Sequence, residues 1–243
     1  MRLDVYLTES GVYKSRARSQ NAIRSGCVKV NGKKITKPSF ELTGPDSYDF
    51  VCDPDPLEYV SRGALKLDFA LDHFEIDVSG LTCLDIGAST GGFTQVLLER
   101  GATSVTAVDV GHGQLDELIA SDPRVIVRED TDIREFSSDV LFDFISADVS
   151  FISVSLLKDK FASLLSPGGN AVVLFKPQFE VGKKYVGKGG IVRSASAAEA
   201  AMSSVIAAFS DCGLDLLGKA TSPIKGGDGN TEYLLHFHLR SVS

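Results

Sequence analysis

The 243-residue sequence lacks the features that mark several common classes of protein. Its four cysteines are far apart and form no C-x-x-C pair, and no histidine lies at zinc-ligand spacing, so we expect neither a structural zinc nor a disulfide framework. No apolar run approaches the roughly 20 residues that cross a membrane, and no apolar signal core follows Met1. These absences predict a soluble, cytoplasmic protein without a bound metal.

Acidic residues are scarce in the first 40 positions. This stretch contains nine lysines and arginines but only two acids, Asp4 and Glu9, which gives it a net charge of +7. The remaining residues carry 16 basic and 30 acidic side chains, a net charge of −14. Charge that is segregated in this way predicts that the basic part contacts a polyanion.

The first 58 residues predict a small α+β domain. A short helix is expected near the start, and Ser15 can cap a second helix that runs to about Ser25. The Asn31-Gly32 dipeptide between two short alternating segments predicts a hairpin. A basic helix beside a basic hairpin favours contact with a nucleic-acid backbone. The predicted RNA contacts of this domain are Arg2, Lys14, Arg16, Arg18, Arg24, Lys29, Lys33 and Lys34.

A segment rich in proline and aspartate, Pro45 to Pro56, predicts strand edges and a linker. We place the boundary near Asp55 to Tyr59, so that an RNA-binding domain spans 1–58 and a second domain spans 59–243. The second domain alternates strand-like with helix-like segments, which predicts an α/β fold with a mostly parallel sheet and helices on both faces. Strands are expected at Cys83–Ile86, Ser104–Asp109, Val125–Val127, Phe142–Ala147 and Ala171–Phe175, helices at Gly92–Arg100, Gln114–Ile119, Ser153–Leu165 and Ala195–Cys212, and a closing hairpin at Leu214–Ala220 and Glu232–Leu239.

A glycine-rich turn between the first predicted strand and its helix is the strongest candidate for a ligand site. Glycine there lets the backbone approach a ligand closely. The spacing excludes two phosphate-binding motifs, because Ser89 stands where a dinucleotide fingerprint needs glycine and Phe93 where a phosphate loop needs lysine. With Asp109 after the next strand, the turn suits a ligand with a ribose and an amino-acid tail, such as S-adenosylmethionine. The predicted cofactor contacts are Asp85, Gly87, Ala88, Ser89, Thr90, Gly91, Gly92, Phe93, Asp109, Val110 and Asp148.

Charged residues also gather at the carboxyl ends of the later strands, where open sheets of this kind bind ligands. Asp148 ends the fourth strand, Lys176 ends the fifth, Glu232 opens the last, and Lys66 lies on the helix before the sheet. A single lysine after a strand is usually solvated. Several charged groups that converge on one edge of a sheet are a candidate catalytic site.

The chain resembles known families in both parts. The motifs R-L-D-x-x-L from Arg2 and V-x-V-N-G-K from Val28 resemble the S4-like RNA-binding domain. A hairpin that closes a parallel sheet resembles class I methyltransferases. Over nearly its full length the sequence resembles the haemolysin A (TlyA) family of ribosomal RNA 2′-O-methyltransferases, whose catalytic domain is FtsJ/RrmJ-like. The motifs that carry this resemblance are Tyr59–Leu67, Asp85–Thr94, Val108–Gly111, Asp148–Ser153, Lys176–Glu180 and Gly229–Tyr233.

This resemblance implies methyl transfer from S-adenosylmethionine to a ribose 2′-hydroxyl of ribosomal RNA, with a cytidine as the expected nucleotide. The family's Lys-Asp-Lys-Glu tetrad carries onto Lys66, Asp148, Lys176 and Glu232. We expect Lys176 to be the base or the oxyanion stabiliser, the two carboxylates to orient it and Lys66 to be its charge partner, although the lysines can exchange roles. Asp132 stands where relatives commonly have Asn, and it is a further candidate for cofactor contact.

The segment from Val181 to Arg193 alternates lysines with glycines beside the predicted site. One interpretation is a surface connection. We favour a lid that contacts RNA and orders on binding. The RNA contacts predicted for the second domain are Arg62, Lys183, Lys184 and Lys188.

Three other functions remain open at this stage. The first is a cytolytic protein, which the family name suggests but no apolar or amphipathic segment supports. The second is an RNA-binding protein with a non-catalytic methyltransferase fold. The third is a small-molecule O-methyltransferase, which leaves the basic first domain unexplained.

Overall fold

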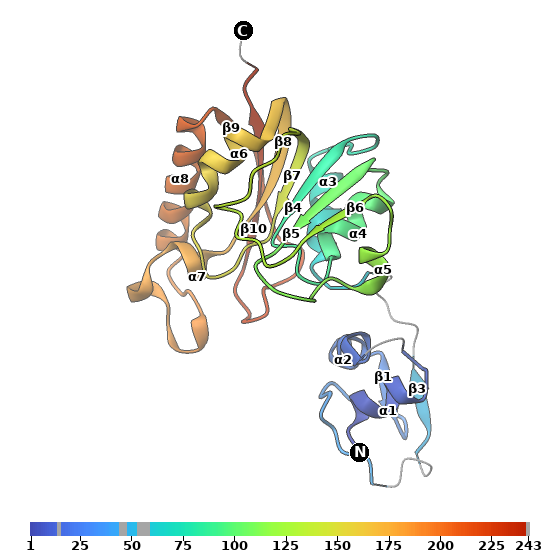
Figure 1. The fold of residues 1–243 in the computed structure, drawn as a ribbon. Coiled ribbons are helices and arrows are strands. Elements are labelled where there is room, and N and C mark those ends of the chain that lie inside the picture. The colour runs from blue at the N-terminus through green and yellow to red at the C-terminus, as the bar shows by residue number, and fades with distance from the viewer. Residues whose placement is uncertain (14–15, 44–47, 53–58, 242–243) are drawn as a thin grey trace. The chain divides into compact units, whose positions relative to one another are not determined.

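The computed structural model describes residues 1–13, 16–43, 48–52 and 59–241. They form two compact units, Met1–Arg62 and Gly63–Ser243, and Figure 1 draws the ribbon of both. Much of the predicted linker between Pro45 and Pro56 lies outside the described residues, as do Lys14 and the predicted cap Ser15.

The first unit contains two helices and a small antiparallel sheet. Asn31 and Gly32 both have positive φ angles, 50° and 74°, and they form the tight turn that the hairpin needs. Leu3, Leu7 and Ile23 pack beneath the sheet in a core of their own. The elements are α1 (Leu3–Glu9), α2 (Arg16–Ser25), β1 (Val28–Val30), β2 (Lys33–Lys34) and β3 (Phe50–Cys52), with the strands in the order β2-β1-β3.

The second unit is built on a seven-stranded sheet of order β6-β5-β4-β7-β8-β10-β9. Strands β4 to β8 are parallel, and β10 is antiparallel to both of its neighbours. This confirms the predicted α/β class with an antiparallel last strand. The strands are β4 (Thr82–Ile86), β5 (Ser104–Val108), β6 (Val125–Arg128), β7 (Phe142–Ala147), β8 (Leu165–Phe175), β9 (Leu214–Thr221) and β10 (Tyr233–Leu239).

Helices cover both faces of this sheet (Figure 1), with α3 and α4 on one side and α6 and α8 on the other. They are α3 (Ala64–His73), α4 (Gly92–Glu99), α5 (Glu117–Ala120), α6 (Lys158–Leu164), α7 (Pro177–Glu180) and α8 (Ala195–Asp211). The unit also contains short 3-10 helices, which are η2 (Val154–Leu157), η3 (Lys183–Tyr185) and η4 (Lys188–Gly190).

The helix predicted at Gln114–Ile119 is shorter in the structure and corresponds to α5. The Glu129 carboxylate accepts the backbone N–H groups of Gly113, Gln114 and Leu115 at 2.6 to 3.0 Å. These hydrogen bonds hold the segment as a loop, and α5 begins only after Asp116, whose side chain caps it. Periodicity in the sequence could not reveal a distant carboxylate that competes for these amides.

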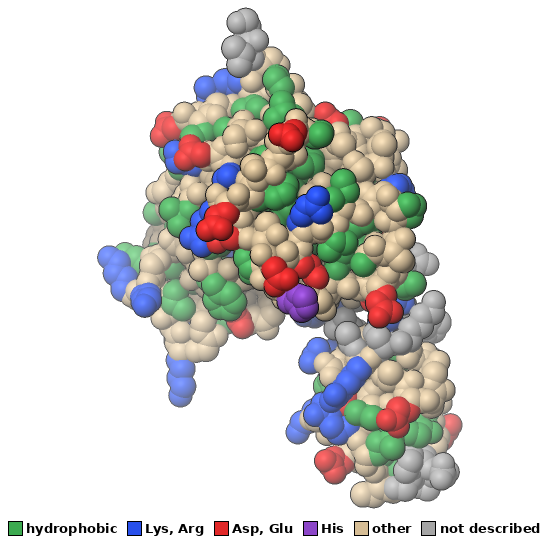
Figure 2. All heavy atoms as spheres, viewed as in Figure 1, with side chains coloured by type: hydrophobic (Ala, Val, Ile, Leu, Met, Phe, Trp, Pro, Cys, Tyr) green, Lys and Arg blue, Asp and Glu red, His purple; other side chains and the backbone are tan. Residues whose placement is uncertain are grey.

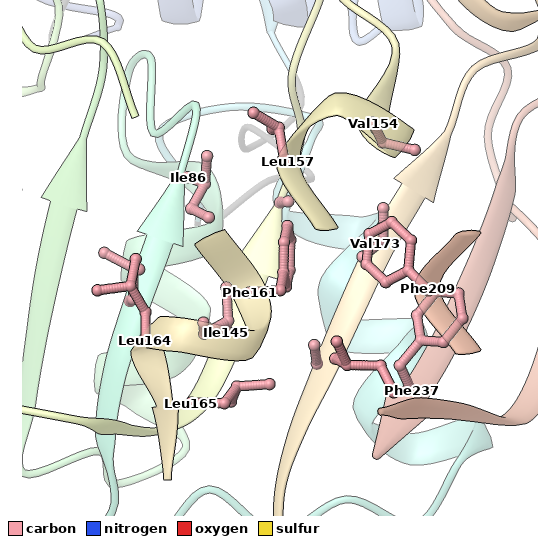
Figure 3. Packing of buried hydrophobic residues seen from close by; sticks show 14 of the residues in the cluster. Ile86, Ile145, Val154, Leu157, Phe161, Leu164, Leu165, Val173, Phe209 and Phe237 are labelled. Atoms are coloured by element: carbon pink, nitrogen blue, oxygen red, sulfur yellow. The ribbon is translucent and has the colours of Figure 1, made fainter. Parts of the chain in front are cut away.

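The core on the α6 and α8 side supports the strands directly below their carboxyl ends (Figure 3). Ile86 on β4 and Ile145 on β7 face Phe161 of α6, and the Phe209 and Phe237 rings stack at 4.6 Å. Full burial of one such side chain stabilises the fold by about 1.5–3 kcal/mol. The strand ends that carry the candidate site are therefore held by rigid packing.

Candidate active site

A cavity of about 510 Å³ opens at the carboxyl ends of β4, β5 and β7. After β4 the chain continues outward to β5 and β6, and it then crosses back to β7 on the other side of β4, so this is the switch point where open α/β sheets bind ligands. Its volume is in the usual range for small-molecule pockets, about 300–1,000 Å³. The lining residues are Ile86, Gly87, Ser89, Val108, Asp109, Val110, Gln114, Thr131, Asp132, Ile133, Arg134, Asp148, Val149, Ser150, Phe151 and Ile152.

The glycine-rich turn forms the floor of this cavity at Gly87. Gly87 has a φ of 78°, and a Cβ built on it would lie 2.6 Å from the carbonyl oxygen of Asp148. No other residue type fits there without moving the β7 end. Of the predicted turn contacts, Gly87 and Ser89 line the cavity. The others, Ala88, Thr90, Gly91, Gly92 and Phe93, form the turn and the start of α4 without lining it.

Asp109 presents its carboxylate at the end of β5. One oxygen accepts the Ser89 N–H at 2.8 Å and the other accepts the Gly111 N–H at 2.7 Å. Each oxygen keeps a second lone pair for a ligand. Val110 follows with its side chain largely exposed at the cavity wall. This pair can hold the two hydroxyls of a ribose and the face of an attached ring.

Asp85 lies beneath the cavity and does not line it. Its side chain is fully buried, and its two oxygens accept hydrogen bonds from the hydroxyls of Thr94 at 2.7 Å and Ser146 at 2.9 Å. Burial raises the pKa of Asp85 to about 6, against the opposing effect of these hydroxyls. The contacts tie β4 to α4 and β7, so the structure gives Asp85 a supporting place.

Asp132 lines the cavity in an ion pair with Arg134, a residue that the sequence did not single out. The guanidinium donates to both carboxylate oxygens, and the Arg134 N–H adds a bond of 2.9 Å. These hydrogen bonds lower the pKa of Asp132 to about 2. Asp132 is therefore ionised at neutral pH and can accept a hydrogen bond from a ligand amino group, although Arg134 already occupies part of its hydrogen-bonding capacity.

The four predicted catalytic residues come together as two pairs. Lys66 on α3 donates to Glu232 at 2.6 Å, and Lys176 after β8 forms an ion pair with Asp148 at 2.5 Å. The Lys66 ammonium is also 3.9 Å from Asp148, so Asp148 links the pairs. Both lysines and Glu232 are buried, while Asp148 borders the cavity. Glu232 thus orients Lys66 rather than Lys176, a partition that spacing along the chain could not give.

Two further residues of this region belong to the Asp148–Ser153 motif, although the sequence predicted no role for them. The Ser150 hydroxyl accepts a hydrogen bond from Lys176 at 2.8 Å, which fixes the ammonium from a second side. Phe151 is 92% exposed, lines the cavity and has a φ of 65°. A bulky residue in the left-handed region stores strain of about 1–3 kcal/mol and is a recognised mark of functional sites.

The first unit presents most of its predicted RNA contacts at its surface, and Figure 2 shows lysines and arginines gathered over one side of it. Arg24, Lys29, Lys33 and Lys34 are exposed. Arg2 and Arg16 are about half exposed, and both donate to the buried carboxylate of Asp4 at about 3 Å. The remaining predicted residues are Arg18, partly buried, Arg62, exposed, and Lys14, outside the described residues.

The segment predicted to be a lid has a defined course. It contains η3, η4 and an isolated bridge between Val186 and Val192. Lys183, Lys184 and Lys188 are exposed, and Lys184 lies over the ring of Tyr185 at 4.9 Å.

No helix in the described part of the chain is long and apolar enough to span a membrane. No three His, Cys, Asp or Glu side chains among the described residues are grouped so as to hold a metal ion.

The fold and the cavity define a Rossmann-like α/β methyltransferase with a small domain before it. Comparison with known proteins gives the family. The FtsJ-like methyltransferase family matches residues 59–239, and the S4 domain matches residues 1–46. The chain belongs to the FtsJ-like methyltransferases and carries an S4 domain.

Similar proteins cover almost the whole chain. Hemolysin A of Brachyspira hyodysenteriae is 41% identical over 98% of this chain and 99% of its own. The 16S/23S rRNA (cytidine-2′-O)-methyltransferase TlyA of Mycobacterium tuberculosis H37Rv is 40% identical over 96% of this chain and 88% of its own. A solved structure of a hemolysin-named protein from Streptococcus thermophilus has a TM-score of 0.78 at 39% identity, covering 99% of this chain and 88% of its own.

The methyl donor of this family is S-adenosylmethionine, and the site fits it. Gly87 leaves a cradle that any Cβ would fill, and Asp109 offers free lone pairs beside the exposed Val110. No basic side chain projects from the glycine turn to bind a phosphate. The residues present therefore match a ligand with a ribose and an amino-acid tail.

Proposed function

We propose that this protein transfers a methyl group from S-adenosylmethionine to the 2′-hydroxyl of a cytidine in ribosomal RNA. The observation that carries the proposal is the pair of buried lysine–carboxylate contacts that meet at Asp148, beside the cofactor cavity. The name of the 40% identical TlyA protein supports the choice of reaction and of nucleotide. The S4 domain supports RNA as the partner.

On the donor side, the cofactor supplies an electrophilic methyl group that an oxygen nucleophile attacks in line. Gly87 and Ser89 would hold the amino-acid tail, Asp109 the ribose hydroxyls, and Asp132 the amino group of the adenine. Orientation of this kind supplies up to roughly 7–11 kcal/mol of a barrier between two reactants. The tight packing of Gly87 against β7 keeps these contacts in register with Asp148.

On the acceptor side, Lys176 contacts the ribose 2′-hydroxyl. As the neutral amine it accepts the hydroxyl proton, and as the ammonium it stabilises the charge that develops on the oxygen. Asp148 and Ser150 fix the position of the Lys176 nitrogen through contacts of 2.5 and 2.8 Å. Lys66 holds its charge 3.9 Å from Asp148 and is held in turn by Glu232. A general acid–base group of this kind contributes about 10²–10⁴-fold to a rate.

Phe151 supplies an apolar platform next to the reacting groups. Its ring lies 5.1 Å from that of Phe179, which follows Lys176 by three residues. An exposed aromatic ring beside a catalytic cavity suits a nucleotide that has left its stack, and stacking of one base contributes about 1–3 kcal/mol. Phe151 therefore positions the target base while Lys176 engages its ribose.

The basic surface of the S4 unit and the lysines of the 183–188 segment hold the RNA backbone. Contacts of this type give affinity that falls with salt and do not read sequence. Because the substrate is ribosomal RNA, the reaction takes place in the cytoplasm.

The proposal is tested by incubating purified protein and labelled S-adenosylmethionine with ribosomal subunits from a strain that lacks the enzyme. Label in ribosomal RNA is the expected result. Label in no RNA fraction contradicts the proposal. If the purified protein lyses red cells, and the Asp109→Ala variant lyses them equally at the same molar concentration, the cytolytic alternative is supported instead.

A further inference from the structure

Asn230 is a buried polar side chain to which the reaction described above gives no role. It lies in the turn between β9 and β10, two residues before Glu232, and is only 3% exposed. Both ends of its amide are used. The side-chain oxygen accepts the Val192 N–H at 2.9 Å, and the side-chain nitrogen donates to the Gly190 carbonyl at 2.8 Å. One amide thus holds the basic segment 182–193 at two backbone groups, on residues that are two positions apart.

The segment is built so that such a hold matters. Gly182, Gly189 and Gly190 all have positive φ angles, a conformation that costs glycine little and other residues more. The fold of the segment includes the Val186–Val192 bridge and a hydrogen bond from the Gly187 N–H to the Ile191 carbonyl at 2.9 Å. The hydrogen bond from the Val192 N–H to Asn230 is therefore made at a residue of this bridge.

The backbone around Asn230 continues the connection to the catalytic carboxylate. The Asn230 carbonyl accepts the Gly226 N–H at 3.0 Å. A Cβ built on Gly226 would lie 2.4 Å from Glu232 Oε1, so the turn lies directly on this carboxylate. The other oxygen of Glu232 receives the Lys66 ammonium at 2.6 Å.

We infer that Asn230 is a positioning residue that couples the RNA-contacting segment 182–193 to the Glu232–Lys66 pair. Contact of the exposed lysines with RNA orders the segment, and the amide of Asn230 transmits that order to the turn that holds Glu232 in place. The inference rests on the proposed function, because it assigns RNA as the ligand of the segment. It predicts that loss of the amide impairs the chemical step more than cofactor binding.

The test compares Asn230→Ala and Asn230→Asp with Asn170→Ala in the full-length protein. Asn170 is a matched control, since it also makes a side-chain hydrogen bond, to His236 at 2.9 Å, but lies six residues before Lys176 in β8. Asn230→Asp keeps the size and the acceptor but loses the donor, so it remains informative if the alanine variant folds poorly. The measurements are single-turnover rate on ribosomal subunits, affinity for S-adenosylhomocysteine, melting temperature, and the rate of tryptic cleavage after Lys183, Lys184 and Lys188.

We expect both Asn230 variants to lower the single-turnover rate by about 10- to 100-fold, the cost of slight misplacement of reacting groups. Cofactor affinity stays within about twofold of the wild type. Tryptic cleavage in the segment is about tenfold faster in Asn230→Ala, which loses both hydrogen bonds, and is also faster in Asn230→Asp, which loses the bond to the Gly190 carbonyl. Asn170→Ala leaves the rate and the cleavage unchanged.

A rate equal to that of Asn170→Ala, or a fall that follows the melting temperature in all three variants, overturns the inference. Failure of the wild type to label RNA overturns the proposed function instead. In that case the cleavage assay still tests whether Asn230 holds segment 182–193. Cleavage as slow as in the wild type refutes this role, and faster cleavage supports it.

Discussion

Asp4 in the S4 unit and Asp85 in the methyltransferase unit are both fully buried carboxylates, yet their pKa values move in opposite directions. Burial raises the pKa of Asp4, but hydrogen bonds from Arg2, Gln20 and Arg16 outweigh that effect and bring the value down to about 2. Burial also raises the pKa of Asp85, and there the neutral hydroxyls of Thr94 and Ser146 and the Thr94 backbone N–H oppose it too weakly, so the value reaches about 6.

The difference shows how each unit uses charge. In the S4 unit a buried anion anchors two arginines whose other faces meet water, so positive charge is oriented toward a partner. In the methyltransferase unit the buried acid is a structural support, and the charges that matter are the paired groups at the strand ends. Under the proposed function, the first arrangement serves docking and the second serves chemistry.

The largest expected effect comes from the charged pair at the strand ends. Lys176→Ala should lower methyl transfer by about 10³-fold or more, because it removes the group that handles the 2′-hydroxyl. Affinity for S-adenosylhomocysteine, measured by calorimetry, should stay nearly unchanged. Asp109→Ala should have the opposite effect: it should weaken cofactor binding but leave the methyl-transfer rate at saturating cofactor nearly unchanged. Undiminished turnover in the Lys176 variant would refute the assignment.

Next is the docking charge of the S4 unit. Replacing Arg24, Lys29 and Lys33 together with glutamine should weaken binding to ribosomal subunits by about 100-fold. The slope of log affinity against log salt concentration should also become shallower, by the amount expected for the loss of about 2 to 3 phosphate contacts. The rate at saturating RNA should not change. A control that replaces two cations of the other unit, Lys219 in β9 and Arg240 just after β10, should leave affinity as it was. Equal losses in both variants would mean that the S4 surface has no special role.

The two buried carboxylates predict opposite pH dependence of stability. The folded-state pKa of Asp4 is lower than in the unfolded chain, so it stabilises the fold above about pH 4 and loses that effect as the pH falls toward 2. We expect about 1–2 kcal/mol, since water screens its half-exposed arginine partners. The folded-state pKa of Asp85 is raised, so its stabilising effect is present below about pH 4 and is lost as the pH rises through 6.

For Asp85 the loss amounts to about 2–3 kcal/mol. Asp85→Asn should therefore flatten the change in urea unfolding free energy between pH 4.5 and 7.5, whereas Asp4→Asn should destabilise most at neutral pH and least near pH 2. Hydrogen exchange in each unit separates the two effects. Parallel pH profiles for the two variants would contradict the contrast between the carboxylates.

The smallest effect is expected at Phe151, where the contact is apolar. Phe151→Ala should raise the KM for ribosomal subunits by about tenfold through lost base stacking, while it also relieves local backbone strain. Phe151→Tyr keeps the ring and serves as the control. A KM unchanged in the alanine variant would show that the exposed ring does not contact RNA.

Much of this organisation could be predicted from the sequence, for physical reasons that particular residues show. Asn31-Gly32 fixed the hairpin because its turn requires two positive φ angles, and the alternating strands and helices gave the α/β class. The glycine turn indicated the floor of the cavity because Gly87 has no room for a side chain. These signals depend on residues that are close together in the chain, so they can be recognised in the sequence.

What the sequence could not give depends on contacts between distant residues. The pairing of Lys66 with Glu232 joins positions 166 apart, and the hold of Arg2 and Arg16 by Asp4 depends on how two helices pack. Arg134 and the exposed Phe151 left no periodic signal. The partners of each charge, rather than the charges themselves, were beyond prediction.

The most direct measurement locates the methyl group itself. Ribosomal RNA labelled by the wild-type protein is digested to nucleosides and analysed by mass spectrometry, with Lys176→Ala in parallel. Our account predicts 2′-O-methylcytidine from the wild type and none from the variant. A methyl group on the base, or the same amount of 2′-O-methylcytidine from both proteins, would contradict it.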